Sequence, residues 1–248
     1  MNKLCKTAVF LALLLLASAV GSSFAAAQGL TPFQVVDRVR DQWQGTSFHC
    51  VVSLDVTQAG ETRSYKVEVW SQGDEYGLLR FLAPEADAGS GYLTIGDDVW
   101  YYAPAAGKAI SLPGFAMGDS LFGSGPALDD LLHGTLSDKY GAEVVLDGTD
   151  YVITLTPLPD SPVVYGSLVV RVRDDFALLS IVYNDQRGEV LRTATFSDYI
   201  MKDGRALPTL MTIEERNGDL TVERLESPEF GIAIDPAIFT VENLEAGQ

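Results

Sequence analysis

The sequence has few cysteines, and this excludes a disulfide framework. Only Cys5 and Cys50 occur among its 248 residues. Cys5 lies in an N-terminal segment that we expect to be removed, so Cys50 alone would remain and no disulfide could form within the chain. Stability must then come from a buried apolar core, and a chain of this length can bury one as a single domain.

Histidine is equally scarce, with His49 and His133 alone in the chain. Two histidines give no metal-ligand cluster. His49 and Cys50 are adjacent, but neighbours in a strand point to opposite faces and cannot form a thiol–imidazole dyad side by side. The acidic pairs mostly coincide with turns or strand ends, and no G-x-S-x-G or phosphate-cradling motif occurs. We expect no enzymatic activity, no metal and no cofactor.

Basic residues are also few in this sequence. Lysine and arginine number 17 against 34 acidic residues, which gives a net charge of −17. This charge argues against binding to nucleic acid or to anionic lipid surfaces, because both are polyanions. It would suit docking onto a basic surface of an inner-membrane transporter, although a need for solubility explains it equally well.

The N-terminus has the order of a secretory signal. Two early lysines precede an apolar stretch over residues 8–20, and small residues follow at Ala25 and Ala27, so we expect cleavage before Gln28. The apolar stretch is shorter than the roughly 20 residues that span a bilayer. No cysteine follows it to accept a lipid anchor, so we expect a periplasmic protein. The expected divisions are a signal peptide, 1–27, and a single domain, 28–248.

A helix is expected at the start of the mature chain. Thr31 suits an N-cap, Pro32 the first helical position, and Gln34 completes a capping box. Apolar residues then recur at helical spacing on one face, and Gly45 gives a stop signal.

After Gly45 the apolar period changes to two, which predicts antiparallel strands separated by short glycine-containing turns. Short turns make sequence neighbours into spatial neighbours, so we expect a long meander that curls into a barrel or partial barrel. The expected strands are 49–57, 62–71, 76–82, 91–95, 99–102, 108–112, 142–146, 151–157, 166–173, 178–183, 189–199, 207–216 and 220–225.

Residues 113–135 break this pattern with repeated glycines and apolar side chains, and a short helix is expected over 127–133. Long segments of this kind inside a domain are usually functional covers. The candidate lid residues are Phe115, Met117, Leu121 and Phe122.

Several motifs in the chain resemble those of the outer-membrane lipoprotein-sorting, or LolA-like, family. An R-F-x-x-P run, a W-x-Y-x-P motif and an M-G-D-S segment occur in the family's order, and the C-terminal D-P-A-I-F-T run fits as well. The resemblance implies a mainly β fold, in which a curved antiparallel sheet forms an unclosed barrel with helices over its open face. It also implies an apolar cavity for acyl chains. The residues that match the family core are Arg80, Phe81, Pro84, Gly91, Leu93, Trp100, Tyr102 and Pro104.

Several strands are apolar on both faces. Either helices and loops cover the second face, or the inner face lines a ligand cavity. Arg80 would contact a headgroup or gate such a cavity, or would pair with Glu75 or Glu85. The candidate cavity residues are Leu79, Arg80, Phe81, Leu93, Trp100 and Tyr102.

The first hypothesis for function is therefore a periplasmic carrier or chaperone that binds acyl chains of lipids or lipoproteins during envelope trafficking. The alternative is a protein-interaction or sensor module on the same scaffold, accessory to an envelope transporter or a stress-signalling system. The second hypothesis places the 113–135 segment against a partner. In this segment and at Gly107–Ile110 the chain departs from the family pattern.

Overall fold

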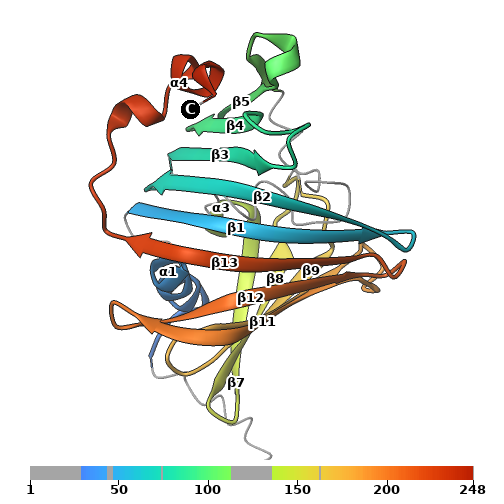
Figure 1. Ribbon diagram of the computed structural model, residues 1–248. Coiled ribbons are helices and arrows are strands. Elements are labelled where there is room, and N and C mark those ends of the chain that lie inside the picture. The colour runs from blue at the N-terminus through green and yellow to red at the C-terminus, as the bar shows by residue number, and fades with distance from the viewer. Residues whose placement is uncertain (1–28, 44–46, 74, 113–135, 162, 248) are drawn as a thin grey trace, which may run out of the picture.

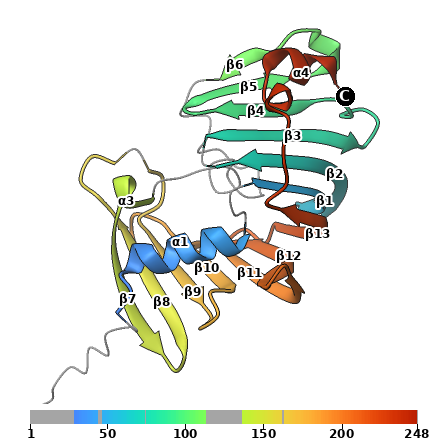
Figure 2. The ribbon, with the colours of Figure 1, turned by 90° about the vertical axis from the view of Figure 1, so that its left-hand side faces the viewer.

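The structure of the protein, a computed structural model, describes residues 29–43, 47–73, 75–112, 136–161 and 163–247. It is dominated by one antiparallel sheet of thirteen strands that curls strongly (Figures 1 and 2). The strands are β1 (Ser47–Gln58), β2 (Glu61–Gln72), β3 (Tyr76–Ala83), β4 (Gly91–Ile95), β5 (Asp98–Tyr102), β6 (Ile110–Leu112), β7 (Tyr140–Asp147), β8 (Asp150–Pro157), β9 (Ser167–Val172), β10 (Leu178–Asn184), β11 (Val190–Lys202), β12 (Arg205–Glu215) and β13 (Leu220–Phe230). The helices are α1 (Pro32–Trp43), η1 (Pro104–Ala106), α3 (Leu136–Lys139), η4 (Pro236–Ile238) and α4 (Val241–Ala246).

All thirteen strands expected from the sequence are present, because alternation of apolar residues and turn chemistry are local signals. Boundaries differ most where a strand continues past its apolar run. β13 extends to Phe230, five residues beyond the expected end, and β6 is shorter than expected because it begins at Ile110. The expected helix over 127–133 lies outside the described residues.

The strand order corrects the expectation of one continuous meander. Along the sheet the order is β6-β5-β4-β3-β2-β1-β13-β12-β11-β10-β9-β8-β7, so the two meanders β1–β6 and β7–β13 meet where β1 pairs with β13. β6 and β7 are consecutive in sequence but form the two opposite edges (Figure 2). The first and last strands of the sheet therefore lie side by side at its centre.

Helix α1 begins with the capping box that the sequence predicts. The Thr31 main-chain nitrogen donates to Oε1 of Gln34 at 2.8 Å, and the Gln34 nitrogen donates to Oγ1 of Thr31 at 3.3 Å. The helix lies within the curl of the sheet (Figure 2), where Val35 is fully buried against strands β7–β12. No helix of the described ranges is long and apolar enough to cross a membrane.

Strand register assigns every side chain to one of two faces. The inner face carries α1 and two apolar clusters, a large one on β7–β12 and a smaller one on β1–β6. The outer face carries a third cluster, formed where the C-terminal segment with η4 and α4 packs on β2–β5. Both faces are covered at least in part, which explains why several strands are apolar on both sides.

Candidate ligand-binding face

The apolar part of the candidate site is the inner-face cluster on β1–β6. All of its members come from strands, and cross-strand register brings them together. Val52 opposes Val67, Val67 opposes Phe81, and Leu79 opposes Tyr92. We call this set the β1–β6 cluster. Its members are Leu54, Val67, Leu79, Phe81 and Val99, with Val52, Tyr65, Val69, Tyr92 and Leu112 partly buried beside them.

Aromatic rings line part of this cluster. The rings of Tyr65 and Phe81 are 6.1 Å apart in an edge-to-face arrangement, and those of Tyr92 and Tyr101 are 4.9 Å apart. Burial raises the pKa of Tyr92, and the nearby Tyr101 adds to that increase. Tyrosine combines a large apolar area with a polar hydroxyl, which suits a surface that contacts an amphiphilic molecule.

A carboxyl group lies on the same face between the two inner clusters. Glu223 on β13 opposes Leu54 of the β1–β6 cluster on one side and Met211 of the β7–β12 cluster on the other. Its side chain is only 7% exposed, and its Oε1 atom has no hydrogen-bond partner among the described residues. Burial raises the pKa of Glu223 to about 8, while the positive charge of Arg192 acts in the opposite direction.

Arg192 on β11 is a buried cation whose charge acts on Glu223, and its guanidinium contacts other groups. Nη2 donates to the Tyr165 hydroxyl at 2.5 Å, Nη1 lies 4.0 Å from a Glu215 oxygen, and the guanidinium carbon is 4.2 Å from the ring centre of Tyr183. Burial raises the pKa of Glu215, and Arg192 acts against that increase. The inner face therefore combines a large apolar area with a short polar section at β13, β12 and β11.

The outer face holds four of the six predicted cavity residues. Leu93 is completely buried, and it packs with Tyr102 and partly buried Trp100 in the outer-face cluster with Phe239 and Leu244. Arg80 lies on the same face, because β-strand alternation separates it from Leu79 and Phe81. The predicted set therefore does not share one surface, and Leu79 and Phe81 alone belong to the inner face.

The C-terminal segment that covers the outer face is fixed by its own caps. Asp235 accepts a hydrogen bond from the Ala237 nitrogen at the start of η4, and Thr240 accepts one from the Asn243 nitrogen at the start of α4. Gly91 permits the close approach of this segment. A Cβ atom there would lie 2.5 Å from the Leu79 carbonyl oxygen and 3.2 Å from the Leu244 side chain.

A family model described as an uncharacterized protein matches residues 73–246. The chain belongs to this family. Among curated proteins, none matches the sequence.

Similar solved structures show that this chain has the LolA-like fold. A domain named for outer membrane lipoprotein sorting, from Vibrio parahaemolyticus, is 18% identical with a TM-score of 0.76, and the match covers 88% of this chain and 99% of that one. A LolA superfamily protein from Nitrosomonas europaea is 19% identical with a TM-score of 0.70, covering 85% and 98% of the two chains. A DUF1329 family protein from Desulfovibrio piger is 23% identical with a TM-score of 0.75, covering 86% and 97%.

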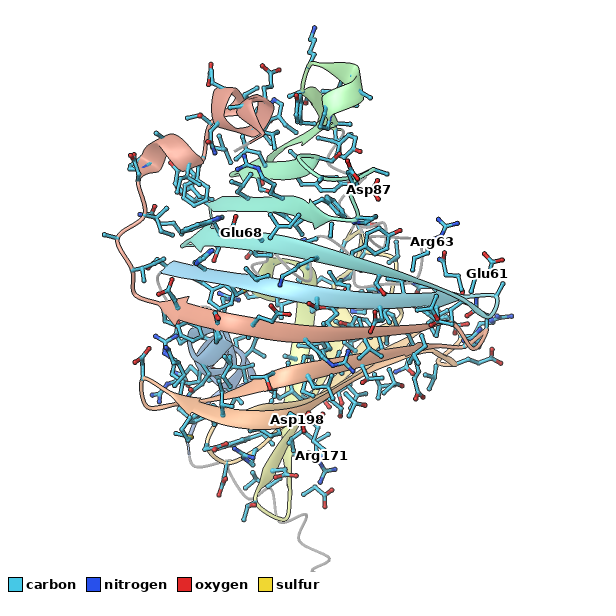
Figure 3. All side chains as sticks on the ribbon, viewed as in Figure 1. Glu61, Arg63, Glu68, Asp87, Arg171 and Asp198 are labelled. Atoms are coloured by element: carbon cyan, nitrogen blue, oxygen red, sulfur yellow. The ribbon has the colours of Figure 1, made fainter. Side chains whose placement is uncertain are left out.

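In this LolA-like fold the two adjacent residues His49 and Cys50 are engaged separately. His49 lies between carboxylates, with Nε2 2.8 Å from Glu68 and Nδ1 3.2 Å from Glu229, and it stacks on Trp70 at 3.6 Å. Figure 3 shows Glu68 on this part of the sheet. Cys50 is buried, and burial strongly raises the pKa of its thiol, with the charges of Glu223 and Glu68 adding to the effect.

Such a thiol stays protonated at neutral pH and does not act as a nucleophile. No group of three metal-binding side chains occurs in the part of the chain that the structure describes. The lid candidates Phe115, Met117, Leu121 and Phe122 and the residue His133 lie outside that part.

Sequence reasoning missed Glu223. The alternating run of β13 places Thr221, Glu223 and Leu225 on one face and Val222 and Arg224 on the other. Neither face is uniformly apolar, so the pattern does not reveal that the glutamate points inward. The sequence does not show that β13 lies at the centre of the sheet. It therefore does not show that the glutamate on this strand is buried.

Proposed function

We propose that this protein is a periplasmic carrier or chaperone that binds acyl chains of lipids or lipoproteins on the inner face of its curved sheet. The observation that supports this most directly is the β1–β6 cluster. It is an apolar and aromatic cluster of buried and partly buried side chains built from strands, on the same face as α1 in a LolA-like fold. The proposal includes export by a signal peptide over residues 1–27, with 28–248 as the working domain, and binding without covalent chemistry.

The free energy that such an apolar cluster can contribute to binding is moderate. Each buried methylene contributes about 0.8 kcal/mol, so ten contribute about 8 kcal/mol. Association itself costs about 4–15 kcal/mol, because the ligand and the protein lose translational and rotational freedom. A rigid sheet that holds its apolar side chains in place before binding keeps that cost low, because little of the protein has to be ordered by the ligand.

Native mass spectrometry of the protein purified from its own envelope tests the proposal. A carrier should retain lipid or a lipoprotein and release it on denaturation. Displacement of a fluorescent fatty acid then measures affinity for wild type and for two matched variants, Tyr92→Ala on the inner face and Trp100→Ala on the outer face. Both remove one partly buried ring from adjacent strands.

Acyl binding should weaken several-fold in Tyr92→Ala and stay unchanged in Trp100→Ala, after correction for the folded fraction. Absence of acyl binding by the wild type, or equal losses in the two variants, would contradict the proposal. A protein that instead retains a polypeptide without acyl chains would support the interaction-module hypothesis.

A further inference from the structure

Two polar side chains with unsatisfied atoms lie next to each other on the inner face of β13. The Oε1 atom of Glu223 and the Oγ1 atom of Thr221 are buried, and within the described chain neither has a hydrogen-bond partner. Residues two apart on a strand point to the same side, about 7 Å from one another. A buried polar atom without a partner is unfavourable, and such atoms in folded proteins usually have a specific reason.

Apolar side chains surround this pair. From β12, Met211 opposes Glu223 and Ile213 opposes Thr221, and from β1 the corresponding residues are Leu54 and Val56. All four are buried.

The titratable and charged groups near Glu223 are few. Among the described residues, Arg192 of β11 is the cation whose charge affects it, and this guanidinium is itself bound to Tyr165 and close to Glu215. From β1, the nearby titratable group is the Cys50 thiol, which interacts electrostatically with Glu223. For the described residues, burial of the carboxyl group outweighs the charge of Arg192, which favours the uncharged form in this environment.

We propose that Glu223 and Thr221 form the polar anchor of the acyl site, where the Glu223 carboxyl group hydrogen-bonds the carbonyl oxygen of the ester or amide that links an acyl chain to its headgroup. This inference rests on the proposed function and adds to it the chemistry of the ligand's linkage. The anchor lies beside Leu54, a member of the β1–β6 cluster. An acyl chain lying over that cluster would therefore bring its linkage to β13.

An uncharged carbonyl group fits the anchor better than a charged headgroup does. An uncharged carboxyl group offers an O–H donor and a carbonyl acceptor, and the Thr221 hydroxyl can also donate or accept. A ligand carboxylate or phosphate would have to lose its water in an apolar site where Arg192, the nearby cation of the described chain, already contacts Tyr165 and lies near Glu215, which is costly. Ester and amide carbonyl groups accept a hydrogen bond and carry no charge.

A matched pair of lipids isolates this contact. The probes are 1-monomyristin and its 1-O-alkyl ether analogue, which differ in the carbonyl oxygen alone, and both are measured by displacement of a fluorescent fatty acid at pH 7. Wild type should prefer the ester by about tenfold, as expected for one buried hydrogen bond. Glu223→Gln should keep the preference, because its amide N–H also donates. Glu223→Leu should bind both lipids with equal affinity.

A second measurement uses pH. The pKa of Glu223 is raised to about 8, so at pH 9 the carboxylate no longer donates, and wild type should lose its preference for the ester. Glu223→Gln should retain the preference at pH 9, because its amide does not titrate.

The outcomes separate the two proposals. Binding of both lipids by wild type with no preference, or an unchanged preference in Glu223→Leu, would overturn the anchor and leave acyl binding standing. Binding of neither lipid by wild type would overturn both proposals together. Glu223→Leu is expected to fold, since it replaces an unsatisfied buried carboxyl group with an apolar side chain.

Discussion

The guanidinium of Arg80 on β3 donates a hydrogen bond from Nη2 to the main-chain carbonyl oxygen of Asn243 on α4, at 2.9 Å across 163 positions of sequence. Arg80 is buried, and burial lowers the pKa of its guanidinium while the charge of Glu68 acts in the opposite direction. Neither Glu75 nor Glu85 is its partner in this bond. In this structure, Arg80 attaches the C-terminal helix to the outer face, away from the apolar inner surface.

The first prediction concerns this attachment. Arg80→Met should reduce the free energy of unfolding by about 1–3 kcal/mol, because the Asn243 carbonyl loses its donor and the favourable charge interaction with Glu68 is removed. Urea denaturation measures the loss, and limited proteolysis should show earlier cleavage near the C-terminus. Arg63→Met is the matched control, since Arg63 is exposed near the tip of the β1–β2 hairpin (Figure 3). A loss of equal size in both variants would contradict the assigned role of Arg80.

The second prediction compares two buried leucines on opposite faces. Leu79→Ala and Leu93→Ala should each reduce the free energy of unfolding by about 2–5 kcal/mol, because both side chains are at most 2% exposed. Affinity for a fluorescent fatty acid, expressed per folded molecule, should fall in Leu79→Ala alone, since Leu93 packs beneath α4. If Leu93→Ala lost affinity and Leu79→Ala did not, the ligand face would be the outer one.

The third prediction is a pH dependence of stability. The pKa of Glu223 is raised from 4.5 to about 8 in the folded protein, so between these values the folded state binds more protons than the unfolded state. Its contribution to stability is fully present below about pH 4.5 and is lost as the pH rises through about 8. The slope is at most about 1.4 kcal/mol per pH unit.

Urea denaturation midpoints between pH 5 and pH 8 measure this slope for wild type and Glu223→Gln. The variant should lose the Glu223 component of the slope. Glu226→Gln is the control on the same strand, because hydrogen bonds from Ser53 and Lys66 lower the pKa of Glu226, which places its titration below this range. Identical slopes in wild type and Glu223→Gln would show that Glu223 is not held protonated.

The fourth prediction concerns the buried thiol. Cys50 should not react with a thiol reagent at pH 8 in the folded protein and should react fully in urea, because burial keeps it protonated and inaccessible. Cys50→Ala should leave acyl binding unchanged while reducing stability by about 1–2 kcal/mol through the lost side-chain volume. Loss of function in a folded Cys50→Ala variant would instead indicate a chemical role for the thiol.

The sequence by itself determined the local elements of this protein. Thirteen strands and the capping box at Thr31 and Gln34 follow from apolar period, turn residues and caps, which act between neighbours in the chain. The order of family motifs also indicated the LolA-like fold. Leu79 and Phe81, two apart in one strand, share a face in the β1–β6 cluster, as strand alternation requires.

Tertiary structure alone decided which strands meet and which face is inner. The pairing of β1 with β13 joins segments more than 160 residues apart, and no local pattern encodes such a pairing. Strands that are apolar on both sides, such as β3 and β5, cannot reveal which side turns inward, so Leu93, Trp100 and Tyr102 were grouped with Leu79 in the sequence. The burial of Glu223 has the same origin. Its environment is made by Met211 of the preceding strand β12 and by Leu54, which the fold brings to its other side from the distant strand β1.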